Sequence, residues 1–366
     1  MVAIKECSPW ANSNRGMRGL LWMLVLTVTV VQPAQAQEVR WEGKVRASGE
    51  LDDNPYRREG DGGEADGLMR YYGELELEAP VGVRGRVLGR MQHGGKVFFG
   101  ERDADAFVSA GLLMASRWWD SGVALRVMGD VKDRSERVSL RDYTRGGTQV
   151  QLSYTGGPFQ GRVGGGFRFF GFKPQPEVSS QGAVVQVGGA LRARDDLLLD
   201  ASWMRSWRGF EVAPLVLDAT RTLDWGDGER RRDVFDVVRL GLTHRWWWIA
   251  ELGYAYQRNR SNSYGQALNR HQAELELTVP GPWELFVSLR AEVQRTRYED
   301  PVLIDETFVL DDENRNALGV ALARRVGRRW EVEVRYHLYA QEFGVGESYR
   351  RQVAGVSLAY DFGSEE

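Results

Sequence analysis

The chain has 366 residues, and its 48 basic and 51 acidic residues give a formal net charge of −3. This balance leaves no basic surplus for a nucleic-acid partner, so nucleic-acid binding is excluded as a function class. The only cysteine is Cys7, so the chain cannot rely on disulfides and must be stabilised by a closed hydrogen-bonded framework or a large core.

Residues 1–36 have the pattern of a secretory signal peptide. Arg18 precedes an apolar run at 20–31, and small residues stand before Gln37 where a signal peptidase cleaves. The run is shorter than the ~20 residues that an apolar helix needs to cross a bilayer, so we expect cleavage near Ala36/Gln37. Met17 also opens a complete signal peptide; under that alternative, residues 1–16 are a mis-called start.

The chain after the signal peptide begins with strict alternation. Odd positions from Val39 to Leu51 are apolar or small, and even positions from Arg40 to Asp52 are polar. Such a pattern predicts a β-strand with two different faces. So many polar residues on one face do not fit a protein core, but they suit a water-filled lumen with the other face toward lipid. A barrel strand needs only ~9–11 residues, with every second one apolar.

The same alternation recurs to the end of the chain and predicts 16 strands in a single domain, residues 37–366. They are placed near 39–52, 68–79, 83–92, 104–116, 123–132, 144–154, 161–172, 182–193, 197–207, 232–245, 249–259, 268–279, 283–296, 314–323, 330–341 and 350–362.

The connections between these strands alternate in length. The short ones are 80–82, 117–122, 155–160, 194–196, 246–248, 280–282 and 324–329. The longer ones are 53–67, 93–103, 133–143, 173–181, 208–231, 260–267, 297–313 and 342–349. Short turns on one side and long loops on the other are typical of outer-membrane barrels, whose turns are periplasmic and whose loops lie at the cell surface.

We therefore predict an all-β fold, a transmembrane antiparallel up-and-down β-barrel of about 16 strands. The sheet must close, because every backbone N–H and C=O in hydrocarbon has to be paired. The expected location is the outer membrane of a Gram-negative bacterium, with the lipid bilayer and lipopolysaccharide as its surroundings. Tryptophans beside the short turns predict an interfacial belt: Trp118, Trp119, Trp246, Trp247, Trp248, Trp283 and Trp330.

The first short turn allows a prediction of register. With a turn centred on Val81, Glu78 faces Arg84 and Glu76 faces Arg86. Opposite-charge pairs across strands contribute ~0.2–1 kcal/mol each, and a slip by one residue would turn these charges toward lipid.

The last predicted strand carries a motif. Gly355, Leu358, Tyr360 and Phe362 resemble the C-terminal assembly signal of bacterial outer-membrane proteins, although residues 363–366 follow the final aromatic. The resemblance implies that the barrel-assembly machinery is a partner. The whole exported chain accordingly resembles a porin-like outer-membrane barrel.

The end of the first strand, Leu51 to Tyr56 (LDDNPY), resembles the corresponding segment of exopolysaccharide-export barrels, such as the barrel domain of the poly-N-acetylglucosamine exporter. This likeness implies a transport conduit and the outer-membrane component of polysaccharide secretion, with polysaccharide as substrate. Because the first strand follows the cleavage site directly, any periplasmic export protein is expected to be a separate chain. A closed structural or surface-interaction barrel (adhesion, motility or an envelope complex) and a general diffusion porin remain as alternatives.

The inward-facing charges form a candidate lumen track in which both signs alternate. Its members are Arg40, Glu42, Lys44, Arg46, Glu74, Glu76, Arg84, Arg86, Arg90 and Arg335. One interpretation is a polar path that passes an ion or a polymer through the barrel. The other is a ladder of ion pairs that fills and stiffens the barrel; arginine forks suit both.

Other candidate sites lie outside the lumen. Asp52, Asp53 and Asn54 at the rim are candidates for binding a sugar or a cation, although an Asx-rich turn that ends the strand is the favoured interpretation. The loops 208–231 and 297–313 contain apolar runs at 212–217 and 302–310, which we expect to fold into the lumen as plugs or to bind a partner. With four scattered histidines and no Cys/His cluster, we expect no enzyme activity, no metal and no cofactor.

Overall fold

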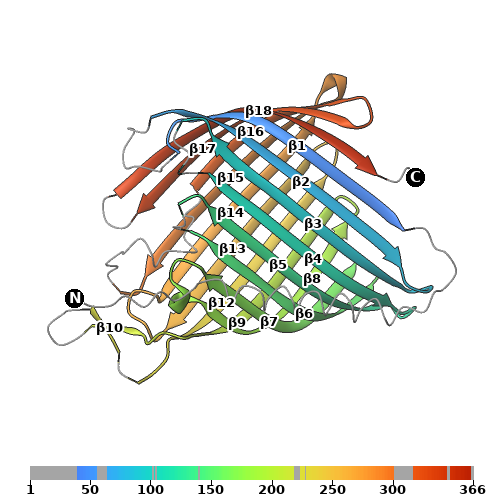
Figure 1. Cartoon of the computed structure of the whole chain (residues 1–366). Coiled ribbons are helices and arrows are strands. Elements are labelled where there is room, and N and C mark those ends of the chain that lie inside the picture. The colour runs from blue at the N-terminus through green and yellow to red at the C-terminus, as the bar shows by residue number, and fades with distance from the viewer. Residues whose placement is uncertain are drawn as a thin grey trace.

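The computed structural model describes residues 39–55, 64–100, 103, 105–138, 141–217, 223–226, 228–300, 316–343 and 347–363. The expected signal peptide lies outside these residues. Sixteen strands form one closed antiparallel barrel in which each strand pairs with its neighbours along the chain (Figure 1). Within the described residues, no helix is long and apolar enough to cross a membrane.

The barrel strands confirm the predicted fold class and all 16 predicted positions. They are β1 (Arg40–Asp52), β2 (Asp66–Pro80), β3 (Gly85–Phe98), β4 (Ala106–Trp118), β5 (Val123–Glu136), β6 (Tyr143–Gly156), β7 (Phe159–Phe172), β8 (Ser180–Arg194), β9 (Leu197–Phe210), β12 (Arg232–Arg245), β13 (Ile249–Ser261), β14 (Leu268–Pro280), β15 (Leu285–Tyr298), β16 (Asn316–Val326), β17 (Trp330–Phe343) and β18 (Glu347–Gly363).

Several strand boundaries differ from the prediction by a few residues, most of all the end of the third strand, which reaches Phe98 rather than 92. The third strand begins at Gly85 rather than at 83, and the strand placed at 283–296 begins at Leu285, because Pro282–Glu284 form a short 3-10 turn (η4) with Trp283 at φ 58°. The connection predicted at 342–349 is shorter, since β17 reaches Phe343 and β18 starts at Glu347. A second 3-10 turn, η3 (Pro176–Val178), lies between β7 and β8.

The loop predicted at 208–231 contains a hairpin that the alternation pattern did not indicate. Its strands are β10 (Leu215–Leu217) and β11 (Leu223–Trp225). Figure 1 shows β10 beyond the ends of the barrel strands, at the rim opposite the end where β1 starts and β18 finishes. The apolar run at 212–217 therefore lies at this rim, and the run predicted at 302–310 falls outside the described residues.

The predicted register of the first hairpin is wrong: the partner of each β2 residue lies four residues further along β3 than expected. Glu76 faces Arg90, and Glu78 faces Leu88. The turn is longer than expected, because Gly82 adopts φ 62° and the Val81 N–H bonds the Gly85 carbonyl at 2.7 Å. An even shift preserves the face on which each side chain lies, so the acidic and basic residues still meet inside the barrel.

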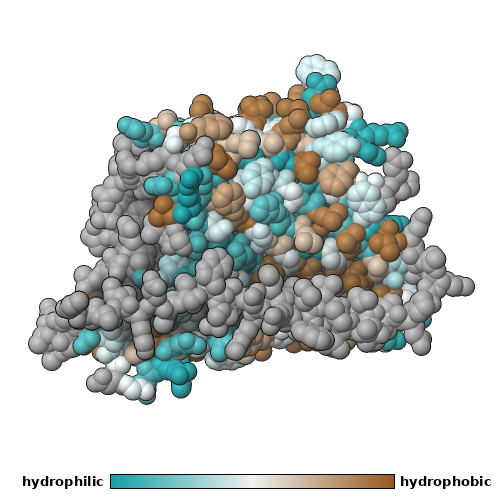
Figure 2. Space-filling model, viewed as in Figure 1, coloured by the Kyte–Doolittle hydropathy of each residue, from teal (hydrophilic) through white to brown (hydrophobic). Residues whose placement is uncertain are grey.

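The two faces of the wall have the predicted character. On β1, the even residues from Lys44 to Asp52 are buried or half-buried, whereas Val45 and Leu51 on the other face are 46% and 66% exposed. Figure 2 shows hydrophobic residues interspersed with polar ones on the part of the outer wall that is visible. Five tryptophans of the predicted belt are exposed near the short turns: Trp119, Trp246, Trp247, Trp283 and Trp330. Trp118 instead shares the inward face of β4.

Candidate functional site: the charged lumen wall

A connected group of inward charged side chains lies on β17, β18, β1, β2 and β3. Period-two alternation puts one face of each strand inside, and the strand pairing aligns these faces across neighbours. We call this sector the charged lumen wall. It brings together most of the predicted track, and Arg335 joins it from the far end of the sequence because β17 lies next to β18, which pairs with β1.

Glu50 is the centre of the wall. Its side chain is 1% exposed and accepts two hydrogen bonds from Arg70, from Nε at 2.9 Å and from Nη2 at 3.0 Å. The Ser48 hydroxyl donates to the same carboxylate at 2.7 Å, and Arg335 forms an ion pair with it. A buried carboxylate needs such partners, because an unpaired buried charge is costly.

The pair between Arg335 and Glu50 spans a whole strand. Gly355 on β18 faces Arg335 on one side and Glu50 on the other. A Cβ at Gly355 would lie 2.7 Å from Glu50 Cγ and 2.9 Å from the Gly49 carbonyl oxygen. The missing side chain therefore opens the gap through which Arg335 reaches from β17 to β1.

A second bridge crosses β18 one step nearer the short turns. Arg46 on β1 donates to Glu331 on β17 at 2.9 Å and lies 3.6 Å from Glu333. The intervening β18 residues are Ser357 and Ala359, both 2% exposed. The small inward face of the last strand thus has a physical reason: ion pairs between its two neighbours pass over it.

The ladder continues onto β2 and β3. Arg90 donates to Glu76 from Nε at 2.8 Å and from Nη2 at 2.5 Å. Glu74 accepts from Gln92 at 2.6 Å and from the Tyr72 hydroxyl. Acidic and basic groups therefore alternate around the wall without a ring of one sign.

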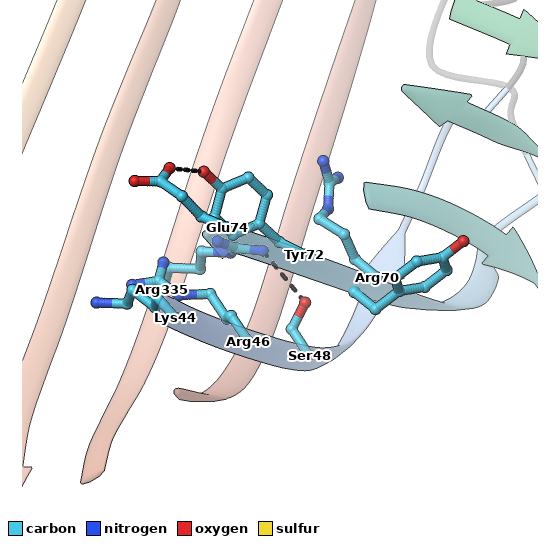
Figure 3. A pocket seen from close by; sticks show the side chains of 8 residues that line it. Lys44, Arg46, Ser48, Arg70, Tyr72, Glu74 and Arg335 are labelled. Atoms are coloured by element: carbon cyan, nitrogen blue, oxygen red, sulfur yellow. Dashed lines mark hydrogen bonds between the residues drawn. The ribbon is translucent and has the colours of Figure 1, made fainter. Parts of the chain in front are cut away.

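A cavity of about 440 Å³ opens on this wall. Figure 3 shows its labelled lining residues, with Lys44, Arg46 and Ser48 from β1, three residues from β2, and Arg335 from β17. Arg70, Tyr72 and Glu74 rise from the same side of β2, and Arg335 donates to Ser48 at 3.3 Å. The cavity offers guanidinium donors, a carboxylate and hydroxyls, which can bind a ligand rich in hydroxyl groups.

The lumen wall of β6, β7 and β8 has a different composition. Its inward positions carry glycines and neutral amides together with Arg145, Arg162 and Arg168, and Gln186 donates to Gln151 at 3.2 Å. The glycines and amides concerned are Gly147, Gln149, Gln151, Gly164, Gly166, Gln186 and Gly188.

The rim residues Asp52, Asp53 and Asn54 lie at the seam that closes the barrel. Asp52 has no exposed surface and receives Arg351 Nε at 2.9 and 3.0 Å. The Asn54 N–H donates to Asp52 Oδ1 at 3.2 Å, and the Gln352 N–H donates to Asp53 Oδ1 at 2.5 Å. This is the geometry of an Asx turn that ties β1 to β18.

The remaining predicted residues lie at the short-turn end. Arg40 and Glu42 are exposed at the start of β1, and Arg84 lies in the β2–β3 turn, paired with Asp120 rather than in the lumen. Leu358 points outward and is 46% exposed. Tyr360 packs on Trp330 with ring centroids 4.7 Å apart, and Phe362 lies 6.1 Å from Trp41. These aromatics cluster where the seam meets the predicted interface.

Sequence reasoning did not single out four members of the wall: Ser48, Arg70, Tyr72 and Arg351. Their position along the strand could have identified them, because each lies on the same inward-facing side of its strand as residues that were predicted. Within the described residues, no group of three or more His, Cys, Asp or Glu side chains is placed to hold a metal ion.

Comparison with known proteins supports the fold. No protein-family model and no curated protein matches the chain. CdiB from Acinetobacter baumannii matches with a TM-score of 0.50 and 11% identity, covering 89% of this chain and 60% of that one. The outer-membrane expressed OmpT of Vibrio cholerae matches with a TM-score of 0.48 and 10% identity, and the match covers 91% of this chain and 100% of that one. A bacterial polysaccharide outer membrane secretin matches with a TM-score of 0.43 and 10% identity, and the match covers 87% of this chain and 98% of that one.

At these identities the likeness concerns the fold. That fold is a closed, antiparallel, up-and-down β-barrel of 16 strands.

Proposed function

We propose that the barrel is a conduit through the bacterial outer membrane for polar, hydroxyl-rich solutes, and that polysaccharide secretion is its physiological role. The observation that carries this proposal is the charged lumen wall with its cavity. Sixteen strands enclose a lumen wide enough for an aqueous path unless side chains or loops fill it. The apolar outer wall supports a membrane location, since a soluble protein rarely exposes so large a contiguous apolar surface.

The balance of charge on the wall favours a sugar over an ion. Selectivity for ions needs a ring of side chains that all carry the same sign of charge, whereas arginines and carboxylates alternate on this wall. Each sugar hydroxyl both donates and accepts, so it can bind an arginine and a carboxylate side by side. Tyr72 adds an aromatic face within the cavity.

The proposal includes no catalytic step. The barrel-assembly machinery inserts the chain, and a separate periplasmic protein delivers the polymer.

Solute flux into proteoliposomes tests the conduit. We expect neutral linear oligosaccharides to enter liposomes that contain the full chain, and entry to slow when the cavity loses Tyr72 (Tyr72→Ala). Tyr336→Ala is the matched control, because Tyr336 is a 40% exposed tyrosine on the outer wall of β17. Equal slowing by both variants would argue against a role of the cavity. Entry of small sugars without oligosaccharides would favour a general diffusion porin.

A second candidate, a surface-interaction barrel, has one observation in its favour. The β10–β11 hairpin at the loop-side rim exposes Val216, Leu217 and Trp225 by 38%, 42% and 47%. Such residues are suited to a protein contact. A barrel that passes no solute, even after residues 211–231 are replaced by a short linker, would favour this function over the conduit.

A further inference from the structure

The outer wall carries a group of arginines on one sector only. Strand pairing places Arg205 beside Asp236, and Asp236 beside Arg258. The same row continues from Arg258 through Asn269 to Arg297. Two further arginines point outward in the adjoining rows. We call the set the outer arginine patch: Arg205, Arg258, Arg260, Arg295 and Arg297, on β9, β13 and β15.

The patch begins where the apolar belt ends. On β15 the outward residues from Leu285 to Val293 are all apolar, and the next two are Arg295 and Arg297. On β13 the outward face changes from Tyr254 and Tyr256 to arginine in the same way. Charge on the lipid face of a barrel is tolerated near an interface and costly at the middle of the membrane. The patch therefore lies at the polar boundary of the loop-side leaflet.

Part of this charge is compensated within the protein. Asp236 accepts from Arg205 at 2.7 and 3.1 Å and from Arg260 at 3.3 Å. Arg258 lies 3.9 Å from Glu299, outside hydrogen-bonding distance. Arg295 and Arg297 are exposed and have no acidic partner in the part of the chain that the structure describes. A surplus of positive charge thus remains on β13 and β15.

We propose that the outer arginine patch binds the phosphate groups of a phosphorylated glycolipid in the loop-side leaflet. Arginine forks match phosphate oxygens, and phosphate is the lipid group that carries the complementary charge. The patch projects sideways from the wall, directly above apolar residues, so a lipid headgroup is what faces it in a membrane. Acyl chains then lie along the apolar face of β14 and β15, and Tyr254 and Tyr256 flank the sugars as interfacial aromatics.

Binding of lipid A to the purified full chain in detergent, measured by native mass spectrometry, tests this site. The test variant is Arg258→Gln with Arg295→Gln and Arg297→Gln, which leaves the Asp236 pairs intact. We expect at least about a tenfold weaker affinity than for the unmodified chain, because phosphate bonds to guanidinium are charge-assisted. The matched control is Arg117→Gln with Arg324→Gln, two outward arginines at the short-turn end, and it should bind as the unmodified chain does.

Three results would overturn the proposal: an unchanged affinity in the test variant, an equal loss in the control variant, or equal binding of dephosphorylated lipid A by the unmodified chain. Inorganic phosphate at equal concentration should not displace lipid A; displacement would assign the patch to free anions. The change in electrophoretic mobility on heating, which reports the folded barrel, must be the same for all variants. Because the patch lies outside the lumen, oligosaccharide flux through the test variant should equal that through the unmodified chain. The lipid site and the proposed conduit can therefore be refuted independently of each other.

Discussion

Gly355 is the position where the seam of the barrel is most sensitive to one added methyl group. In Gly355→Ala, the new Cβ would lie 2.7 Å from Glu50 Cγ and 2.9 Å from the Gly49 carbonyl oxygen. Overpacking of this kind costs ~1–3 kcal/mol. Displacement of Glu50 also weakens its hydrogen bond with Arg335, and bonds to charged groups contribute ~1.5–3 kcal/mol. We therefore expect the free energy of unfolding to fall by about 3 kcal/mol.

Gly49→Ala is the matched control on the facing strand. Nothing lies within 4 Å of a Cβ built at Gly49, which points outward. Alanine in a strand is favoured over glycine by ~0.5–1 kcal/mol, so this variant should be neutral or slightly stabilised. Denaturant unfolding of the refolded barrel in lipid vesicles, followed by tryptophan fluorescence, gives both values. Equal destabilisation by the two variants would refute the idea that Glu50 and Arg335 need the gap at Gly355.

Three further predictions concern the seam and the topology. Asp52→Asn leaves Arg351 without a buried counter-charge and should lower the free energy of unfolding by about 3 kcal/mol; an unchanged denaturation midpoint would contradict this. Deletion of Leu358 to Phe362 removes the short-turn half of the seam and should block assembly, seen as loss of the heat-modifiable band from outer membranes, whereas a folded band would argue against it. The only cysteine is Cys7 in the expected signal peptide, so a single introduced cysteine reports which side of the membrane a loop faces. Glu229→Cys should react with an impermeant maleimide on intact cells, and Asp120→Cys should not. The reverse pattern would show that the barrel has the opposite orientation.

The sequence was sufficient for the faces of the strands but not for the contacts between distant strands. Alternation with period two places Lys44, Arg46 and Glu50 inside because lipid and water select opposite residue types on the two faces. The register at Glu76 was mispredicted because it depends on the turn, where Gly82 takes a positive φ.

The bridge between Arg335 and Glu50 could not be predicted from the sequence. It joins residues 285 positions apart and depends on a glycine in the strand between them. The small inward face of the last strand was visible in the sequence, but its reason requires the order β17–β18–β1. The outer arginine patch is similar, since its residues become neighbours only when five strands are paired.

Conductance of the purified full chain in planar lipid bilayers tests the central claim most directly. The account predicts discrete single-channel steps, which decrease when linear oligosaccharides enter the lumen and are less sensitive to them in Tyr72→Ala than in Tyr336→Ala. A variant with the 299–315 connection shortened should conduct at least as well. Absence of conductance in both the full chain and this variant, with the barrel folded, would contradict the claim that the lumen is a conduit.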